Sequence, residues 1–392
     1  MDKRIGGLVS VLVTALPVVA EAAKLLVAMN GTDGPTCGAT VATACRTISR
    51  AIANARPGDT VEVGPGRYGD LNQDGSLAGV GEEAGQVDTG CDCVVHVSKR
   101  CVVVSRLGAK ATVIDAVGAF ANVVRIAESG TTFGKRGKGF TVTGSGDGRG
   151  LDSSAEDLAI GGNVFVANAS HGLRLSGDRA VVVGNTAADN GGSGFQLDGA
   201  RSSVIRGNVA LHNGADGFNQ VNAFSLVAGN VSLGNDEDGF DQQGEDVVYQ
   251  GNAALANGGS GFDLNACDRT VVVGALAHGN RRGIEVDGSD TVITKSSIVG
   301  NVGVGIDVQD GGRALVVSKT NVFGNNAAPD PIATNCGVTS LSGGPLALAT
   351  VYWGAASGPG ADPADELCLL VPHGGLVTAP PATKEMRVKP PR

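Results

Sequence analysis

The fold is decided by a stretch that the chain repeats three times in succession: Asn213-Gly214-Ala215-Asp216-Gly217-Phe218, Asn235-Asp236-Glu237-Asp238-Gly239-Phe240 and Asn257-Gly258-Gly259-Ser260-Gly261-Phe262. Its glycine, followed by a large apolar residue, recurs on both sides. The seven glycines are Gly172, Gly194, Gly217, Gly239, Gly261, Gly283 and Gly305. They are separated by steps of 22, 23, 22, 22, 22 and 22 residues. A fixed period of this size is typical of a solenoid protein.

The content of each repeat indicates which solenoid this is. Short apolar runs with alternating pattern, such as Ala180-Val181-Val182-Val183, are divided by glycine and asparagine turns, and no repeat has room for a helix of about ten residues. The fixed leucine positions of a leucine-rich repeat are absent. The pattern predicts an all-β fold: a right-handed, single-stranded parallel β-helix with about 22 residues per coil.

In such a fold equivalent residues stack on one another from coil to coil. We expect an inward aromatic column of Phe195, Phe218, Phe240 and Phe262. Asparagines should stack in the turns and satisfy each other's amides. One ladder contains Asn163, Asn185, Asn208, Asn230 and Asn252; the other contains Asn168, Asn190, Asn213, Asn235, Asn257 and Asn301, with Gly279 as an exception. We interpret both as core and turn chemistry.

Composition agrees with one elongated, turn-rich domain. The chain has 62 glycines among 392 residues, and 42% of its residues are hydrophobic. The formal net charge of −9 argues against nucleic acid as a partner, because no basic stripe offsets the phosphates. We expect a monomer that binds an acidic polysaccharide or another glycan.

The sequence divides into five expected segments. Residues 1–23 have the charged start, apolar stretch and Ala20-Glu21-Ala22 site of a secretory signal peptide, and the apolar run is too short to span a membrane. Residues 24–58 form a cap whose short helix, with Ile48 and Ile52 on one face, plugs the open end of the core. The β-helix covers 59–345, a closing segment 346–378, and a disordered basic tail 379–392. The protein is therefore expected to be secreted or located in the cell envelope.

Eight cysteines fit disulfides in an oxidising compartment. By proximity we expect Cys37 to pair with Cys45 and Cys336 with Cys368. The other four, Cys91, Cys93, Cys101 and Cys267, are left unassigned, with a metal site at Cys91 and Cys93 as an alternative.

An acidic column follows the repeat glycines. The residue two positions after each glycine lies between two inward residues and so points outward. In order these residues are Arg174, Gln196, Asn219, Asp241, Asp263, Glu285 and Asp307. The bends add Asp216, Asp236, Glu237 and Asp238. Converging carboxylates repel each other unless a cation offsets them, and oxygen ligands suit Ca²⁺. The alternative is a solvated acidic face without an ion.

Two further stretches resemble those of a known superfamily. Residues 47–68, with the amphipathic helix and Gly64-Pro65-Gly66-Arg67-Tyr68, resemble the N-terminal cap of secreted β-helix proteins of the pectin-lyase-like superfamily. Tyr352-Trp353-Gly354 resembles their closing motif. The resemblance covers about three quarters of the chain and implies the fold. The superfamily contains lyases, hydrolases, esterases, epimerases and inert adhesins, so the fold alone leaves the function open.

One coil has a closer resemblance. Asp236-Glu237-Asp238-Gly239-Phe240-Asp241 is similar to the calcium-binding coil of family-nine pectate lyases, although that family has Asp where this chain has Glu237. The resemblance implies that Asp216, Glu237, Asp238 and Asp241 hold Ca²⁺, which binds a polygalacturonate carboxylate while a lysine removes the proton on carbon five. Here Asp263 stands at the place of that lysine.

The catalytic candidates are therefore Asp263, Arg281 and Arg282, and the outward residues Asn219, Glu285 and Asp307 are candidates for substrate contact. The two arginines are either bases or surface charges that offset the nearby acids. Asp263 and Asp241 could instead form the carboxylate pair of a hydrolase. Two functions stay open: a calcium-assisted polysaccharide lyase, and a glycan-binding or structural β-helix without catalysis.

Overall fold

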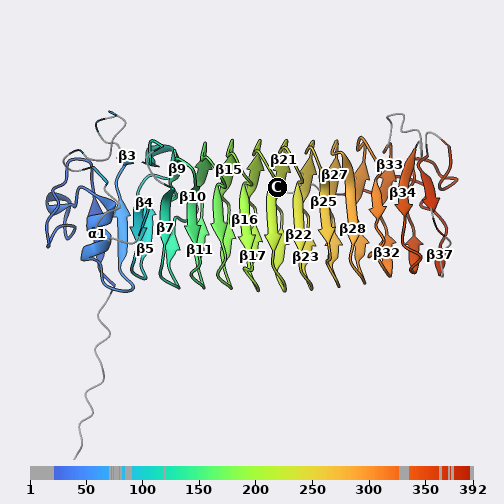
Figure 1. Cartoon of the computed structure of the whole chain (residues 1–392), viewed down its shortest axis with the longest axis horizontal. Helices are drawn as coiled ribbons and strands as arrows, with labels where there is room; N and C mark the ends of the chain where they lie inside the picture. The colour runs from blue at the N-terminus through green and yellow to red at the C-terminus, as the bar shows by residue number, and fades with distance from the viewer. Residues whose placement is uncertain are drawn as a thin grey trace, which may run out of the picture.

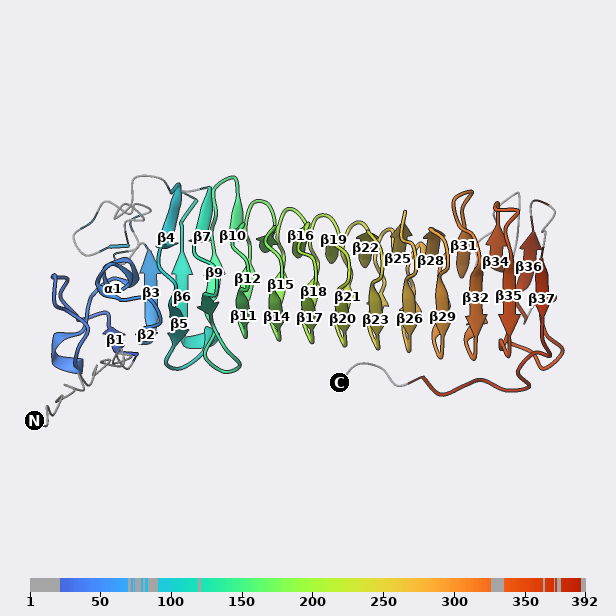
Figure 2. The ribbon, with the colours of Figure 1, turned by 90° about the horizontal axis from the view of Figure 1, so that it is seen from below.

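The structure is a computed structural model that describes residues 22–69, 72, 74, 79, 82, 83, 91–118, 121–325, 335–361, 364–369, 371 and 375–388. Coils of chain stack along one long axis (Figure 1), and each coil between the two ends contributes one strand to each of three parallel sheets. Figure 2, turned by 90°, shows the same stack from below. This is the predicted parallel β-helix.

The 12-stranded sheet carries the acidic column. From the N-terminal end its strands are β4 (Cys93–Val97), β7 (Asn122–Ile126), β10 (Arg149–Ser153), β13 (Leu173–Leu175), β16 (Phe195–Asp198), β19 (Phe218–Val221), β22 (Phe240–Gln243), β25 (Ser260–Asn265), β28 (Arg282–Asp287), β31 (Ile306–Val308), β34 (Cys336–Ser340) and β36 (Glu366–Leu369).

The 14-stranded sheet runs the full length of the stack. Its strands are β1 (Lys24–Val27), β2 (Thr60–Val63), β5 (Val102–Ser105), β8 (Thr132–Phe133), β11 (Ala159–Gly161), β14 (Val181–Val183), β17 (Val204–Arg206), β20 (Leu226–Ala228), β23 (Val248–Gln250), β26 (Val271–Val273), β29 (Val292–Thr294), β32 (Leu315–Ser318), β35 (Leu346–Ala349) and β37 (Leu376–Thr378).

The 11-stranded sheet completes the coil. Its strands are β3 (Gly66–Gly69), β6 (Thr112–Asp115), β9 (Thr141–Thr143), β12 (Val164–Val166), β15 (Thr186–Ala188), β18 (Val209–Leu211), β21 (Val231–Leu233), β24 (Ala253–Leu255), β27 (Leu276–His278), β30 (Ser297–Val299) and β33 (Asn321–Phe323). Outside the sheets lie one α-helix, α1 (Ile48–Asn54), and two 3-10 turns, η1 (Val41–Thr43) and η3 (Ala109–Ala111), among the described residues.

The aromatic column forms as predicted. Phe195, Phe218, Phe240 and Phe262 are fully buried, and successive ring centroids lie 4.8 Å apart with nearly parallel planes. Aromatic pairs add about 0.5–1.5 kcal/mol beyond the burial of their area. The column therefore stabilises the coils from β16 to β25 and fixes which residues of these strands face outward.

The asparagine ladders also form, with one correction. The amide of Asn190 donates to the carbonyl of Phe165 and to Oδ1 of Asn213, and the same pattern recurs on each coil. At the expected exception the ladder continues, because Asn280 takes the place next to Gly279: Asn257 donates to Asn280 at 2.9 Å, and Asn280 donates to Asn301 at 3.1 Å. The ladder is thus unbroken through these buried turns.

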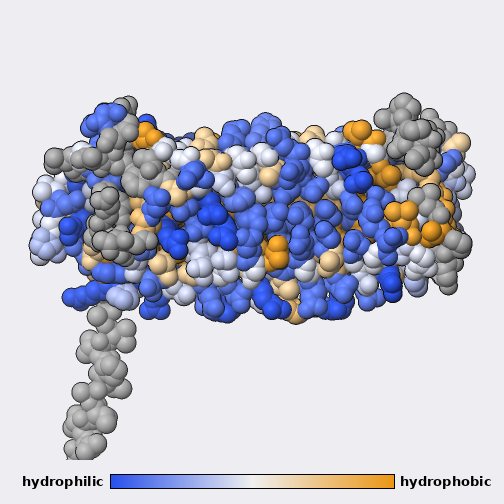
Figure 3. Space-filling model, in the orientation of Figure 1, coloured by the Kyte–Doolittle hydropathy of each residue, from blue (hydrophilic) through white to orange (hydrophobic). Residues whose placement is uncertain are grey.

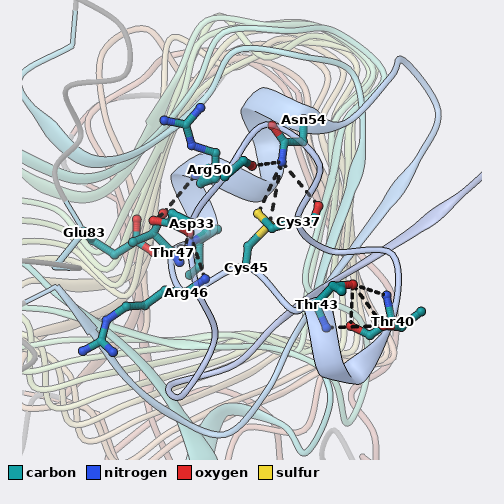
Figure 4. Close-up of a disulfide and its surroundings, with 12 residues drawn as sticks. Asp33, Cys37, Thr40, Thr43, Cys45, Arg46, Thr47, Arg50, Asn54 and Glu83 are labelled. Carbon is teal, nitrogen blue, oxygen red and sulfur yellow. Dashed lines mark hydrogen bonds between the residues drawn. A yellow bond between two sulfur atoms is a disulfide. The ribbon is translucent and has the colours of Figure 1, made fainter.

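The N-terminal end is closed by α1, as the sequence predicts. Figure 4 shows the helix beside the Cys37–Cys45 disulfide, with Thr47 capping its start by accepting a hydrogen bond from the Arg50 N–H at 3.1 Å. Buried Glu83 accepts from the N–H groups of Ile48 and Ser49. Burial raises the pKa of Glu83 to about 7.

Both expected disulfides are confirmed: Cys37 pairs with Cys45, and Cys336 with Cys368. Cys91 and Cys93 form a third disulfide, so their sulfurs are not free for the metal site that we had left as an alternative. The two remaining cysteines, Cys101 and Cys267, are buried free thiols.

The C-terminal segments extend the stack further than the expected boundary at residue 345. Strands β35, β36 and β37 continue the 14- and 12-stranded sheets. After β37 the chain turns back along the solenoid (Figure 2). The backbone of Met386 exchanges two hydrogen bonds of 2.8 Å with the Asn321 side chain, so this part of the tail lies against β33 although we expected it to be disordered.

The ends of the chain lie partly outside the described residues. The expected signal peptide falls there except for residues 22 and 23, as do tail residues 389–392. None of the helices in the described part of the chain combines the length and the hydropathy needed to cross a membrane.

Candidate functional site

The outward column of the 12-stranded sheet stacks in the predicted register. Asn219 pairs with Asp241, Asp241 with Asp263, Asp263 with Glu285, and Glu285 with Asp307. Inward neighbours on the same strands, such as Phe240 and Phe262, are fully buried and hold these residues outward. Hydrophilic residues predominate along most of the side of the molecule seen in Figure 3.

A surface pocket of about 330 Å³ lies on this column. It brings together residues of three successive coils: Asp236, Glu237, Asp238, Gly258, Gly259, Ser260, Asp263, Arg281, Arg282 and Glu285. All three catalytic candidates, two of the four expected calcium ligands and one expected substrate contact therefore share one pocket. Asn219 and Asp307 do not line it.

The remaining two expected calcium ligands lie on the neighbouring coil and strand. The Asn219 amide donates to Asp216 at 2.8 Å and to Asp241 at 2.9 Å, so it bridges the two carboxylates. Asp216, which is 4% exposed, also accepts from the Asp238 N–H at 3.0 Å. The other Asp241 oxygen, Oδ1, is buried and has no hydrogen-bond partner among the described atoms.

The two arginines of the pocket differ in their contacts. Arg282 forms ion pairs with Glu285 at 2.9 Å and with Asp307 at 3.2 Å. Asp307 also accepts from Thr339 at 2.6 Å, outside the pocket. Arg281 is exposed. Arg282 thus balances the acidic column, while Arg281 is the cation that a bound molecule can reach.

Crowding raises the pKa of three carboxyl groups. Burial is the largest cause in each, followed by neighbouring carboxylates for Asp241 and Asp263. Burial raises the pKa of Asp238 to about 6; a hydrogen bond from the Ser260 N–H lowers it, and repulsion from neighbouring carboxylates adds to the rise. The pKa of Asp241 is raised to about 7. The pKa of Asp263 is raised to about 8, although Arg282 lowers it.

The expected calcium ligands fit the ion in chemistry more than in geometry. All are oxygen donors, and the unpartnered Asp241 Oδ1 is available to a cation. However, no three carboxylates of this set approach within 4.8 Å of one another in the described part of the chain. The one such group there, Asp33 with Cys37 and Cys45, has its sulfurs in a disulfide. An ion at Asp241 would require Glu237, which is exposed, to turn inward.

A buried polar cluster lies beneath the site. Gln220 and Gln242 are fully buried on adjacent coils, and the Tyr249 hydroxyl lies between them, 3.2 Å and 3.0 Å from their side-chain oxygens. Tyr249 comes from the 14-stranded sheet, on the far side of the coil. Nothing in the repeat pattern connects these residues, so the sequence does not predict this bridge.

Comparison with known proteins agrees with this geometry. Residues 124–284 match the family model described as right handed beta helix region. This chain has the fold of a right-handed parallel β-helix. A search of curated proteins finds no significant match to this β-helix chain.

Solved structures resemble this β-helix protein over most of its length. The A-module of the mannuronan C-5 epimerase AlgE4 from Azotobacter vinelandii matches with a TM-score of 0.63 and 18% identity, over 82% of this chain and 91% of that chain. The catalytic unit of an α-1,3-glucanase from Streptomyces thermodiastaticus matches with a TM-score of 0.56 and 12% identity, over 94% and 70%. Pectate lyase Pel9A, at 16% identity over 79% and 81%, reaches only 0.43, which is too low to support an inference. At these identities the likeness shows the fold alone.

Proposed function

We propose that this protein binds an acidic polysaccharide along the outward face of the 12-stranded sheet and cleaves it by β-elimination, with Asp263 as the base. The observation that carries the proposal is the pocket that unites Asp263 with Arg281, Arg282 and the carboxylates of the preceding coil. A concave site with convergent polar groups and perturbed pKa values is the usual place for catalysis.

The properties of Asp263 support its role. A general base works best when its pKa lies near the operating pH. The pKa of Asp263 is raised to about 8 by burial and by Asp238, Glu285 and Asp241, so its ionised form is far more basic than an ordinary carboxylate. A carboxyl group so placed can replace the lysine that family-nine pectate lyases have at this position.

The ionised Asp263 takes the proton from carbon five of a uronate, and the electron pair forms a double bond between carbons four and five. The bond from carbon four to the glycosidic oxygen breaks, and that oxygen takes a proton from solvent. Exposed Arg281 is free to donate hydrogen bonds to the substrate carboxylate or to the leaving oxygen.

We propose Ca²⁺ as the cofactor. Glu237, Asp238 and Asp241 would hold it, with Asp216 behind them, and when bound there it would pair with a substrate carboxylate and acidify the neighbouring proton. This proposal explains why five carboxyl residues and only two arginines line the pocket, since an anionic polymer would otherwise be repelled.

Secretion belongs to the same proposal. Three disulfides favour an oxidising compartment, where an extracellular polymer would be met. The epimerase and the glucanase named above act on polysaccharides, as their names say, which supports a glycan as the partner. We propose that the protein does so as a monomer.

The test combines calcium binding with product formation. Wild type, Asp263→Asn and Asp238→Ala would be titrated with calcium by calorimetry, then incubated with polygalacturonate or mannuronan while the absorbance of unsaturated product is followed. Asp263→Asn should lower the rate by about 10²–10⁴-fold, the usual contribution of a general base, and leave calcium binding in place. Asp238→Ala should weaken calcium binding.

The control is Asp310→Asn, which removes one exposed carboxylate outside the pocket and should change neither measurement. Product formed equally by Asp263→Asn and wild type would show that Asp263 is not the base.

A second candidate function is glycan binding without catalysis. It is favoured by the same pKa of Asp263, because a carboxyl group with a pKa of about 8 is mostly protonated at neutral pH and cannot then accept a proton. Binding of polysaccharide without product at any pH between 6 and 10 would establish this alternative.

A further inference from the structure

Three arginines surround one buried carboxylate near the N-terminal end of the 12-stranded sheet. Asp152 on β10 is 6% exposed. Its oxygens lie 3.2 Å from Arg125 on β7, 3.3 Å from Arg174 on β13 and 3.7 Å from Arg149 on its own strand. The three side chains are 32–43% exposed, so the cluster reaches the surface.

This ratio of charges is unlike the other arginine clusters of the described residues. In each of three other clusters one arginine serves two carboxylates: Arg179 with Glu156 and Asp157, Arg269 with Glu245 and Asp246, and Arg282 with Glu285 and Asp307. At Asp152 three arginines share one carboxylate, and only Arg174 reaches a second, Asp198, at 2.7 Å. Three cations against two anions leave one positive charge, in a chain whose formal net charge is −9.

The arginines also have hydrogen-bonding capacity to spare. Each guanidinium has five N–H donors in a planar fork. Arg125 uses one of them on Asp152, and the buried Nε of Arg149 has no hydrogen-bond partner among the described atoms. Burial, and then the charge of Arg149, lower the pKa of neighbouring His171, so the imidazole adds no charge of its own at neutral pH. Such a fork fits a carboxylate or a sulfate through two parallel hydrogen bonds.

The cluster lies in line with the pocket. Strand pairing leads from Asp152 through Arg174, Gln196, Asn219 and Asp241 to Asp263, which is five steps. At ~4.8 Å per step the two places are about 24 Å apart on one face. Between them lie Gln196 and Asn219, whose amide N–H groups already donate to neighbouring side chains, so their amide oxygens are the groups left to accept hydrogen bonds from hydroxyl groups.

We propose that Arg125, Arg149 and Arg174 form a second binding site, which takes a carboxylate or sulfate group of an anionic polysaccharide five coils from the pocket. That the bound chain continues into the pocket rests on the function proposed above. Two consequences follow: long chains that reach both places bind more tightly than short ones, and the gain is lost at high salt, because screened charges attract less.

The test measures binding without turnover. Asp263→Asn is the parent, so that the polymer is not consumed, and calorimetry follows its binding of polygalacturonate and of oligogalacturonides of increasing length, at low and high salt. Arg149→Gln is the first variant, because Arg149 holds Asp152 least closely. Arg149→Lys keeps the positive charge but removes the planar set of guanidinium donors, so it tests whether that geometry matters. Arg179→Gln, outside the outward column, is the matched control.

Arg149→Gln should weaken polymer binding about tenfold, as expected for the loss of a charge-assisted hydrogen bond, and Arg149→Lys should restore only part of it. The gain in affinity from oligomers too short to span five coils to longer ones should shrink in Arg149→Gln, and the melting temperature should not change. Polymer affinity within twofold of the parent for Arg149→Gln, or no binding of the anionic polymer by the parent, would overturn the proposal.

These outcomes separate the site from the function. If Arg149→Gln weakens binding but wild type forms no product, the arginine site stands and the lyase fails. If wild type forms product while Arg149→Gln binds the polymer as its parent does, the lyase stands and the arginine site fails.

Discussion

The two halves of the 12-stranded sheet use the same outward positions for opposite charges. From β7 to β13 the column and its neighbours hold Arg125, Arg149 and Arg174 around Asp152. From β22 to β31 the column is Asp241, Asp263, Glu285 and Asp307, with Arg282 alone in ion pairs with it. Both halves share parallel strand pairing and an asparagine ladder, although their core residues and loop lengths differ. The comparison teaches that the coil determines where a side chain points, and that the identity of the outward residues determines which charge each half presents.

If the scaffold is the same in both halves, equivalent asparagines of the ladder should contribute equally to the free energy of unfolding. Asn168, just before β13, and Asn257, just before β25, are 2% and 3% exposed, and each bonds the next asparagine at 2.9 Å. Asn168→Ala and Asn257→Ala should each lower the free energy of unfolding by about 1–3 kcal/mol, since each leaves buried groups unpaired. Urea denaturation measures this, with exposed Asn265→Ala as the control. If Asn168→Ala and Asn257→Ala lower the free energy of unfolding by amounts that differ by more than the measurement error, the two halves do not share one scaffold.

The acidic half should make stability depend on pH, and Glu83 in the N-terminal cap, whose pKa is raised to about 7, should add to this dependence. The pKa values of Asp238, Asp241 and Asp263 are raised in the folded state from 3.8 to about 6, 7 and 8. The folded state therefore binds more protons than the unfolded state between about pH 4 and 8, and its stability falls as the pH rises through that window. In a chelator the melting temperature should drop from pH 5 to pH 9, and calcium should restore it at the upper end.

Asp263→Asn should flatten the upper part of that profile, while Asp310→Asn should leave its shape unchanged. A melting temperature that rises from pH 5 to pH 8 in chelator would show that these carboxyl groups are not crowded in solution.

The smallest expected effect concerns Arg282, the arginine that forms ion pairs with the acidic column. Arg282 lowers the pKa of Asp263, so Arg282→Gln should raise that pKa and move the rising limb of the pH–rate profile to higher pH. At pH 7 the rate should fall on the order of two- to tenfold, since one pKa unit changes the ionised fraction tenfold. Arg281→Gln shares the pocket but is not among the charges that shift Asp263, so it should leave the midpoint in place. If Arg282→Gln leaves the midpoint of the rising limb of the pH–rate profile unchanged, that limb does not report the ionisation of Asp263.

Much of the candidate site followed from the repeat. The outward stacking of Asp241, Asp263 and Glu285 was predicted because the coil length is constant there, and the structure pairs them in that register. The arginine cluster was missed. Arg125 and Asp152 pair although 27 residues separate them, because their coil lies before the regular repeat and its loop is longer. The hydrogen bonds of Asn280 and Tyr249 were not predicted for a similar reason. Each residue reaches its partner across a turn or the core, where spacing along the chain gives no indication of contact.

The sequence by itself determined the solenoid, its period, the stacked phenylalanines and the outward acids, because all of these depend on one repeated distance along the chain. It also determined two disulfides, whose cysteines are close to each other along the chain. Tertiary structure decided which acids share a pocket, which of them have raised pKa values, which arginine is already paired, and that the tail returns to β33. The physical reason is that burial and charge act through space between coils. Their strength depends on how deeply neighbouring loops enclose a group, and that is a property of the folded stack.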